Sequence, residues 1–206
     1  MATHTEGTLA CNGITIRYAE LGTGQPVVVF PAAGGTLFDD VTTALADQYR
    51  VISLDISPFR EREGVDDVTH LAPALARLGI SSFCVVGVSN GAASAVIQAV
   101  YAPDVVSRVI LVAPTRAILQ HPQLAAKLGE VKAPTLVLVG TRDRSGAREV
   151  GQLCRAQIPV CHLLFVYDAG ETIAAERRDA CLSPMTEFLE KGEGFIVSQE
   201  SQLIRP

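Results

Sequence analysis

A short apolar run that ends at a glycine constrains this chain more than any other feature. Residues 83–86 are four consecutive apolar residues, the pattern of a strand that is buried on both faces, and Gly87 follows them. In residues 92–100, alanines and branched apolar residues recur with helical spacing. Ser89 therefore lies where a buried strand turns sharply into a buried helix.

Gly87, Ser89 and Gly91 form the pattern Gly-x-Ser-x-Gly around this turn. Glycine has no Cβ to collide with its surroundings when a tight turn pushes the serine hydroxyl outward. The strand and helix on either side distinguish the motif from a glycine-rich turn with an incidental serine. With this nucleophile elbow, the chain resembles the α/β-hydrolase superfamily, in particular its small members without a large lid domain. The resemblance extends from about Gly13 to the C-terminus.

The composition is that of a single α/β domain spanning residues 1–206. The chain is 48% hydrophobic and 19% charged, and its length is sufficient for a sizeable core. A net charge of -5 without any basic run argues against nucleic acid or a membrane surface as partner. No apolar run approaches the roughly 20 residues that span a bilayer. We therefore expect a cytoplasmic monomer or homodimer whose partner is a small-molecule substrate or ligand.

The cysteines do not indicate a disulfide framework or a metal site. There are five of them, and no two are spaced as Cys-x-x-Cys. We expect most of them to be small core residues, and we expect neither a metal nor a cofactor. The five are Cys11, Cys84, Cys154, Cys161 and Cys181.

Apolar runs separated by helical stretches predict the fold. Such an alternation is typical of an α/β protein with a mostly parallel, doubly wound sheet. The α/β-hydrolase fold implied by the resemblance has this architecture. The runs are residues 27–30, 51–54, 83–86, 109–112, 135–139 and 162–167.

Three segments flank or interrupt this pattern. Around Asn12 and Gly13, residues 8–21 alternate in the manner of an antiparallel hairpin. The connection 114–134 is short at the point where larger members of the superfamily insert a lid, so the resemblance implies an open site. The tail 192–206 is apolar enough to pack on its own domain, which we favour, or on a second subunit.

The resemblance implies an oxyanion hole next to Ser89. Its donors would be the backbone N–H groups of Asn90 and of Ala33, which lies in the loop after the first buried run. The chain departs from the superfamily pattern here, because Pro31 and Ala32 stand where His-Gly is usual.

The resemblance also implies an acidic member of the triad. Asp143 follows the buried run 135–139 and Gly140, where the superfamily has the aspartate that orients the catalytic histidine. The alternative is an ordinary surface aspartate paired with Arg142 or Arg144.

The histidine itself is missing, because Glu171 follows Gly170 at its position. A carboxylate is a weaker base than imidazole near neutral pH and forms no cation to stabilise an oxyanion. Further along, Glu176 has the pattern of an ordinary helix surface. Of the four histidines, His121 in the short connection is the one possible substitute base. The four are His4, His70, His121 and His162.

Three interpretations follow. The favoured one is a serine hydrolase-like enzyme that acts on a small ester, lactone or acyl compound through Ser89, with Asp143 and Glu171 as an atypical relay. Activity on generic esters would be weak, since loss of a triad member lowers rates by about 10⁴-fold or more. The alternative is a catalytically silent relative that binds a small ligand or has a structural role. The third is that residue 171 was altered from histidine.

Overall fold

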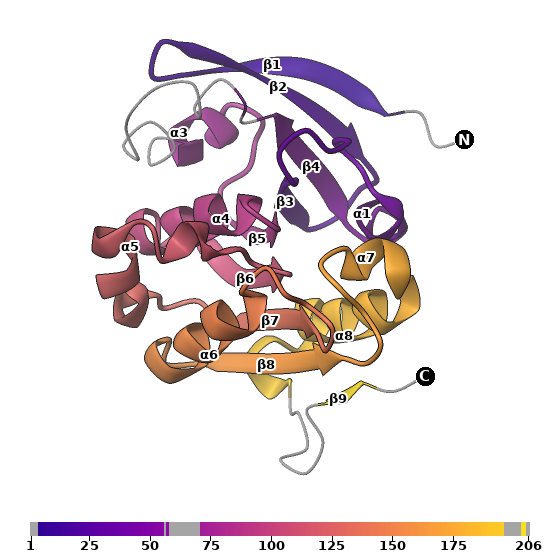
Figure 1. Cartoon of the computed structure of the whole chain (residues 1–206). Coiled ribbons are helices and arrows are strands. Elements are labelled where there is room, and N and C mark those ends of the chain that lie inside the picture. The colour runs from indigo at the N-terminus through magenta and orange to yellow at the C-terminus, as the bar shows by residue number, and fades with distance from the viewer. Residues whose placement is uncertain (1–3, 56, 58–70, 196–202, 205–206) are drawn as a thin grey trace.

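The computed structural model of the chain describes residues 4–55, 57, 71–195 and 203–204. Over these residues, nine strands form one sheet in the order β1-β2-β4-β3-β5-β6-β7-β8-β9 (Figure 1). The pairs β1–β2 and β2–β4 are antiparallel, and the remaining pairs from β4 to β9 are parallel. The predicted fold class, an α/β protein with a mostly parallel sheet, is confirmed.

The strands follow the apolar runs of the sequence. The central ones are buried on both faces, and every residue of β7 is buried, because helices cover both sides of the sheet. Asn12 and Gly13, both with positive φ, connect the first two strands in a tight turn. The strands are β1 (Thr5–Cys11), β2 (Ile14–Leu21), β3 (Pro26–Phe30), β4 (Arg50–Asp55), β5 (Phe83–Val88), β6 (Val106–Val112), β7 (Thr135–Gly140), β8 (Cys161–Val166) and β9 (Leu203–Ile204).

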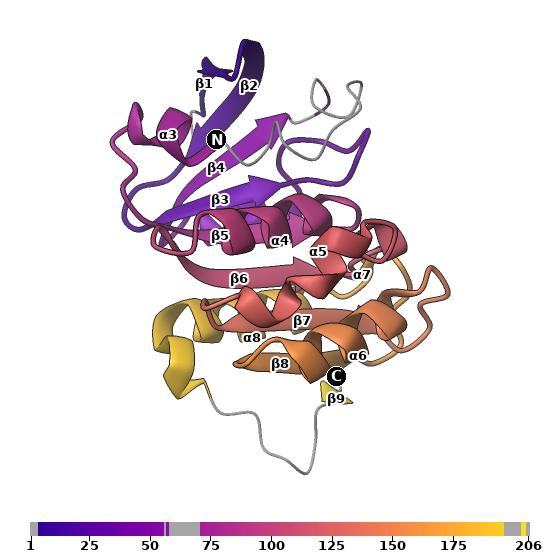
Figure 2. The ribbon, with the colours of Figure 1, turned by 90° about the vertical axis from the view of Figure 1, so that its left-hand side faces the viewer.

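Helices lie on both faces of the sheet. In Figure 2, α4, α5 and α6 lie in front of the sheet and α8 lies behind it. Two apolar clusters correspond to these two sides, one including α3, α4 and α6 and the other including α1 and α8. The helices are α1 (Asp40–Leu45), α3 (Leu71–Ala76), α4 (Gly91–Tyr101), α5 (Pro122–Ala126), α6 (Ala147–Gln157), α7 (Ile173–Glu176) and α8 (Arg178–Lys191), with short 3₁₀ turns at η2 (Arg116–Ile118), η3 (Leu128–Glu130) and η4 (Gly192–Gly194). In the described ranges, no helix has the length and hydropathy needed to cross a membrane.

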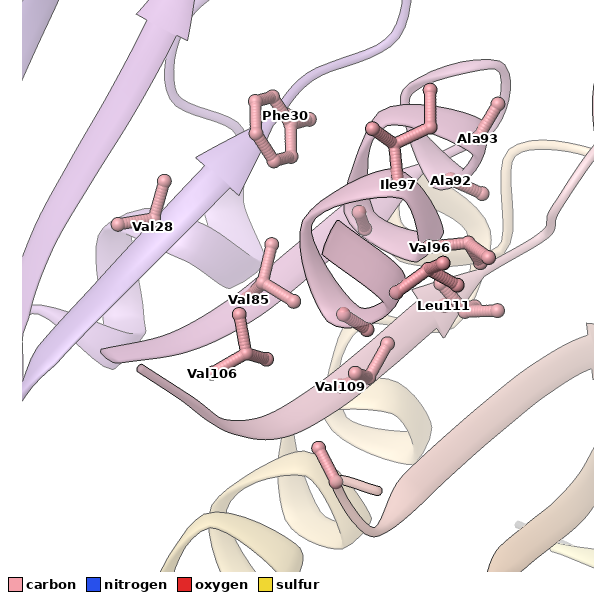
Figure 3. Packing of buried hydrophobic residues seen from close by; sticks show 14 of the residues in the cluster. Val28, Phe30, Val85, Ala92, Ala93, Val96, Ile97, Val106, Val109 and Leu111 are labelled. Carbon is pink, nitrogen blue, oxygen red and sulfur yellow. The ribbon is translucent and has the colours of Figure 1, made fainter. Parts of the chain in front are cut away.

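Helix α4 is buried on all sides, since its residues 91–100 are all buried. The sheet covers one side, and Figure 3 shows Val85, Val96 and Leu111 in this packing. The connection between β6 and β7 contacts the helix through η2 and η3. Ile118 and Leu128 of this connection belong to the same apolar cluster. The segment that replaces a lid thus completes the core around α4.

The described part of the C-terminal tail packs on the chain's own domain. Phe195 is buried, and its ring lies 5.2 Å from the ring of His162 and 5.5 Å from that of Phe188. Further along, β9 adds to the sheet as a parallel neighbour of β8. The tail therefore extends the cluster beneath α8.

The start of α4 approaches the end of β3 so closely that only glycine fits. A Cβ added at Gly91 would overlap the backbone carbonyl oxygen of Phe30. Backbone atoms cannot move aside as the end of a flexible side chain can. By contrast, a Cβ at Gly129 would meet nothing closer than 3.8 Å.

We expect Gly91→Ala to lower the free energy of unfolding by about 1–3 kcal/mol, the usual cost of overpacking a core. The comparison is with Gly129→Ala, whose new methyl group has room. Urea unfolding followed by circular dichroism measures both. Equal stability of the two variants would show that the helix can shift away from β3.

His162 is a half-buried titratable group in the aromatic cluster around Phe195. Burial, together with the nearby charge of Arg155, lowers the pKa of His162 below its usual 6.5. Its Nε2 atom is buried and makes no hydrogen bond within the described residues. Below pH 6.5 the unfolded chain binds a proton at this ring more readily than the folded chain does.

The folded state should therefore lose stability as the pH falls below about 6.5, and His162→Phe should reduce that loss. The two proteins should differ in how steeply the free energy of unfolding changes with pH. This difference should stay below about 1.4 kcal/mol per pH unit, the limit for one proton, since the ring is only half-buried. Urea unfolding of both proteins at pH 7.5 and 5.5 measures it. An identical pH dependence in the two proteins would contradict this assignment.

Candidate active site

The parallel register brings four loops to one edge of the sheet. Phe30 pairs with Gly87, Val88 with Val112, and the end of β7 with the end of β8. The loops after β3, β5, β7 and β8 therefore leave the sheet on the same side, where sites form in such folds. These loops carry the residues singled out in the sequence: Ala33, Ser89 with Asn90, Asp143 and Glu171.

Ser89 occupies a left-handed turn between β5 and α4. Its φ is +55°, a conformation that costs a non-glycine residue energy. The turn is held by a 2.8 Å hydrogen bond from the Ser89 N–H to the carbonyl of Val112. At Gly87, an added Cβ would come within 2.6 Å of the Cα of Ala92. Both glycines of the motif are thus required by close backbone contacts.

Ser89 as a whole is half-buried at the edge of the sheet where these loops leave it. No residue that the structure describes forms a hydrogen bond with the Ser89 hydroxyl. A nucleophilic serine needs a base within about 2.6–3.2 Å when substrate is bound, although this contact is often longer in the free protein.

The loop after β3 contacts the turn through a side chain. The Ala33 N–H donates a 2.8 Å hydrogen bond to Oδ1 of Asn90. Ala33 is exposed and Asn90 is half-buried. The loop also has an internal bond from the Gly35 N–H to the carbonyl of Ala32 at 3.0 Å. The N–H of Ala33, the predicted second oxyanion donor, is thus engaged by the side chain of the residue that follows Ser89.

A pocket of about 220 Å³ opens beside this loop. Besides loop residues, it is lined by Arg17, Asp55 and Ser57. The Ser57 hydroxyl and the Arg17 guanidinium, which lies 2.7 Å from the carboxylate, hold the pKa of Asp55 below its usual value. A small polar molecule could enter this pocket next to the candidate oxyanion hole.

Asp143 lies in the loop after β7 and holds the start of α6. Its carboxylate accepts hydrogen bonds from the N–H of Ser145 at 3.0 Å and from the N–H of Ala147 at 3.2 Å. The Ser145 hydroxyl also donates to it at 3.1 Å. The carboxylate is therefore fixed in position, as a residue that orients a partner must be. The alternative pairing with Arg142 or Arg144 is absent among the described contacts.

Glu171 lies in the loop after β8. The strand β8 is three positions away from β5 in the sheet, or about 14 Å at the usual strand spacing. This loop leans over the end of β7, because a Cβ added at Gly140 would overlap the carbonyl oxygens of Ala169 and Gly170. The Glu171 side chain is exposed and has no hydrogen bond or ion pair to any described residue. No hydrogen bond joins it to Asp143 or Ser89.

Glu176 is exposed at the end of α7, where the sequence predicts a helix surface, and it also holds this loop. Its carboxylate accepts hydrogen bonds from the N–H of Gly170 at 3.0 Å and the hydroxyl of Thr172 at 2.9 Å. These bonds, with the charge of Arg142, lower its pKa. Arg142 also pairs with Asp168 at 3.2 Å, which joins the loops after β7 and β8. The Thr172–Glu176 spacing was the available signal for this role.

The described histidines have surroundings that do not join them to these groups by a hydrogen bond. His4 pairs with Glu6 near the N-terminus at 2.9 Å. His121 precedes α5, is exposed and has no side-chain hydrogen bond. His162 is in β8, and His70 lies outside the described residues. None of the three described rings makes a hydrogen bond to Ser89, Asp143 or Glu171.

The cysteines belong to the core, as the sequence predicts. All five are buried, and none of them is disulfide-bonded. Burial raises the pKa of Cys154, Cys161 and Cys181 to about 12, so these thiols stay protonated. Across the described part of the chain, no three His, Cys, Asp or Glu side chains are grouped so that they could hold a metal ion.

Comparison by sequence gave no relatives. No protein-family model matches the chain, and no curated protein matches it either. Comparison by structure gave many similar chains, all of those described below under 25% identical. At this level of identity, the similar structures are evidence for the fold alone.

Three of these structures illustrate the similarity. A predicted CIB-like hydrolase from Thermoplasma acidophilum has a TM-score of 0.74 at 20% identity, covering 92% of this chain and 99% of that chain. An enol-lactonase from Burkholderia xenovorans also has a TM-score of 0.74, at 18% identity, covering 89% of this chain and 100% of its own. A meta-cleavage product hydrolase from Pseudomonas fluorescens has a TM-score of 0.75 at 16% identity, covering 89% of this chain and 97% of that chain. The chain therefore has the α/β-hydrolase fold.

Proposed function

We propose that the chain is a serine hydrolase-like enzyme that acts on a small ester, lactone or related acyl compound. The observation that carries this proposal is the left-handed conformation of Ser89 in the strand-to-helix turn at the shared strand edge. A strained residue persists only where its surroundings enforce it, and such residues gather at functional sites. Here the Val112 carbonyl and two tight glycine contacts enforce it.

In the proposed reaction, the Ser89 oxygen forms a bond to the acyl carbon and the alcohol leaves. Water then hydrolyses the acyl-serine and releases the acid. The backbone N–H groups of Asn90 and Ala33 would stabilise the oxyanion at each step. Asp143 and Glu171 would form the relay, with Glu171 or a water molecule carrying the hydroxyl proton.

The proton-transfer step should limit this enzyme. Glu171 is exposed and unpaired in the described structure, and Asp143 has its bonds within its own loop. An exposed carboxylate removes a proton from serine poorly near neutral pH, since general base catalysis is most effective when the pKa lies near that pH. Weak activity on generic esters is the expected result.

The second candidate function is a catalytically silent protein that binds a small ligand. The observation that favours it is the Ala33 N–H, which is engaged by the Asn90 side chain instead of being open to a substrate. The pocket lined by Arg17, Asp55 and Ser57 would then be the ligand site.

Hydrolysis of p-nitrophenyl acetate between pH 5 and 9 distinguishes the two functions. We expect slow turnover by the unmodified protein and none beyond background by Ser89→Ala. We expect Glu171→His to raise the rate about 10²-fold or more, the usual contribution of a positioned imidazole. Because surface imidazole also attacks this ester, Glu187→His on α8 serves as the matched control.

The remaining outcomes decide between the two functions and identify the base. If Ser89→Ala equals the unmodified protein while Glu171→His gains activity, the binding function is the better one. If Glu171→His gains no more than Glu187→His, Glu171 does not occupy the position of the base. A rate lost in His121→Ala would instead identify His121 as the base.

A further inference from the structure

The hydrogen bond between Ala33 and Asn90 joins the two residues proposed to form the oxyanion hole. The Ala33 N–H donates to the side-chain Oδ1 of Asn90 at 2.8 Å. The backbone N–H of the same Asn90 is the other proposed donor. Asn90 therefore contributes its backbone N–H to the hole as one donor. Its side-chain oxygen also accepts the hydrogen bond of the other donor, the Ala33 N–H.

A backbone N–H directs one strong hydrogen bond, and that bond weakens steeply when the angle departs from linear. The Ala33 N–H cannot therefore bind a substrate oxygen fully while it is bonded to Asn90. An incoming oxygen must displace the carboxamide. The bond lies at an exposed position, where water can replace either partner during the exchange.

We propose that the Asn90 carboxamide is a built-in occupant of the oxyanion hole, which a reacting substrate must displace. This inference rests on the proposed function. Hydrogen bonds to charged oxygens are about twice as strong as those between neutral groups. An oxyanion can thus displace the carboxamide oxygen, whereas a neutral ester carbonyl gains little by doing so.

The consequence is weak binding of unreacted substrate. The hole opens only for an oxygen that has gained charge, so it binds unreacted esters weakly. Such differential binding stabilises the transition state without stabilising the ground state. The rate is nevertheless lowered by the hydrogen bond that must be broken first.

The loop after β3 has other contacts that keep its conformation without Asn90. The Gly35 N–H donates to the Ala32 carbonyl at 3.0 Å. The Thr36 hydroxyl donates to the Phe38 carbonyl at 2.7 Å. Removing the Asn90 carboxamide should therefore free the Ala33 N–H and leave the loop in place.

The test is the rate at which a fluorophosphonate labels Ser89, measured by intact-protein mass spectrometry. The serine oxygen bonds to phosphorus, fluoride leaves, and the hydroxyl proton passes to water, while the phosphonyl oxygen occupies the hole. Asn90→Leu keeps the size of the side chain and removes the acceptor. We expect it to label about 5-fold faster, or about 1 kcal/mol at 1.4 kcal/mol per factor of ten.

Two further variants sharpen the test. Asn90→Asp places a charged acceptor on the Ala33 N–H, so labelling should slow at least 10-fold at pH 7.5. Ser107→Ala removes a hydrogen bond to the Phe83 carbonyl at the opposite end of β5 and should leave the rate unchanged. Asn90→Ala repeats the Leu experiment with a smaller side chain, and circular dichroism checks the fold of each variant.

Slower or unchanged labelling of both Asn90→Leu and Asn90→Ala would overturn the inference, because Asn90 would then only support the loop. Ser89-dependent labelling with no effect at Asn90 would leave the proposed function standing. Absence of Ser89 labelling in every variant would overturn both.

Discussion

The parallel hydrogen bonding of β3, β5, β6, β7 and β8 is the interaction on which the rest of this structure depends. It fixes the register in which Phe30 lies opposite Gly87 and Val88 opposite Val112. Strands that run parallel and in register end at one edge, so loops that are far apart in the sequence leave the sheet side by side. The parallel arrangement therefore determines where each candidate residue of the site lies.

The same arrangement explains why the turn at Ser89 tolerates strain. Helix α4 is buried on all sides, between the sheet and the connection from β6 to β7. Its start can move neither toward Phe30, where Gly91 already leaves no room for a Cβ, nor outward into its covering. Residues in sparsely populated backbone regions cost about 1–3 kcal/mol and persist only in such surroundings. The packing of α4 thus offsets the free-energy cost of the left-handed backbone at Ser89.

Around this rigid centre, the polar side chains mainly hold the backbone of loops. Asn90 holds Ala33, Asp143 holds the start of α6, and Glu176 holds the loop that carries Glu171. Glu171 differs from them in being exposed and without a partner in the described structure. The chain has the α/β-hydrolase fold, while no described contact restrains the carboxylate of Glu171, which we propose moves the proton.

The sequence by itself determined the strands and the sharp turn at Ser89, because buried apolar runs such as residues 83–86 and glycine spacing are local signals. The sequence also predicts that Glu171 stands where the superfamily has its catalytic histidine. The hydrogen bonds of the exposed Glu176 to Gly170 and Thr172 span only six and four residues, so a local spacing indicates them. Only the tertiary structure decided that the Asn90 side chain engages Ala33, because this contact joins residues 57 positions apart. The pairing of β3 with β5 brings these two residues together, and no local pattern encodes it.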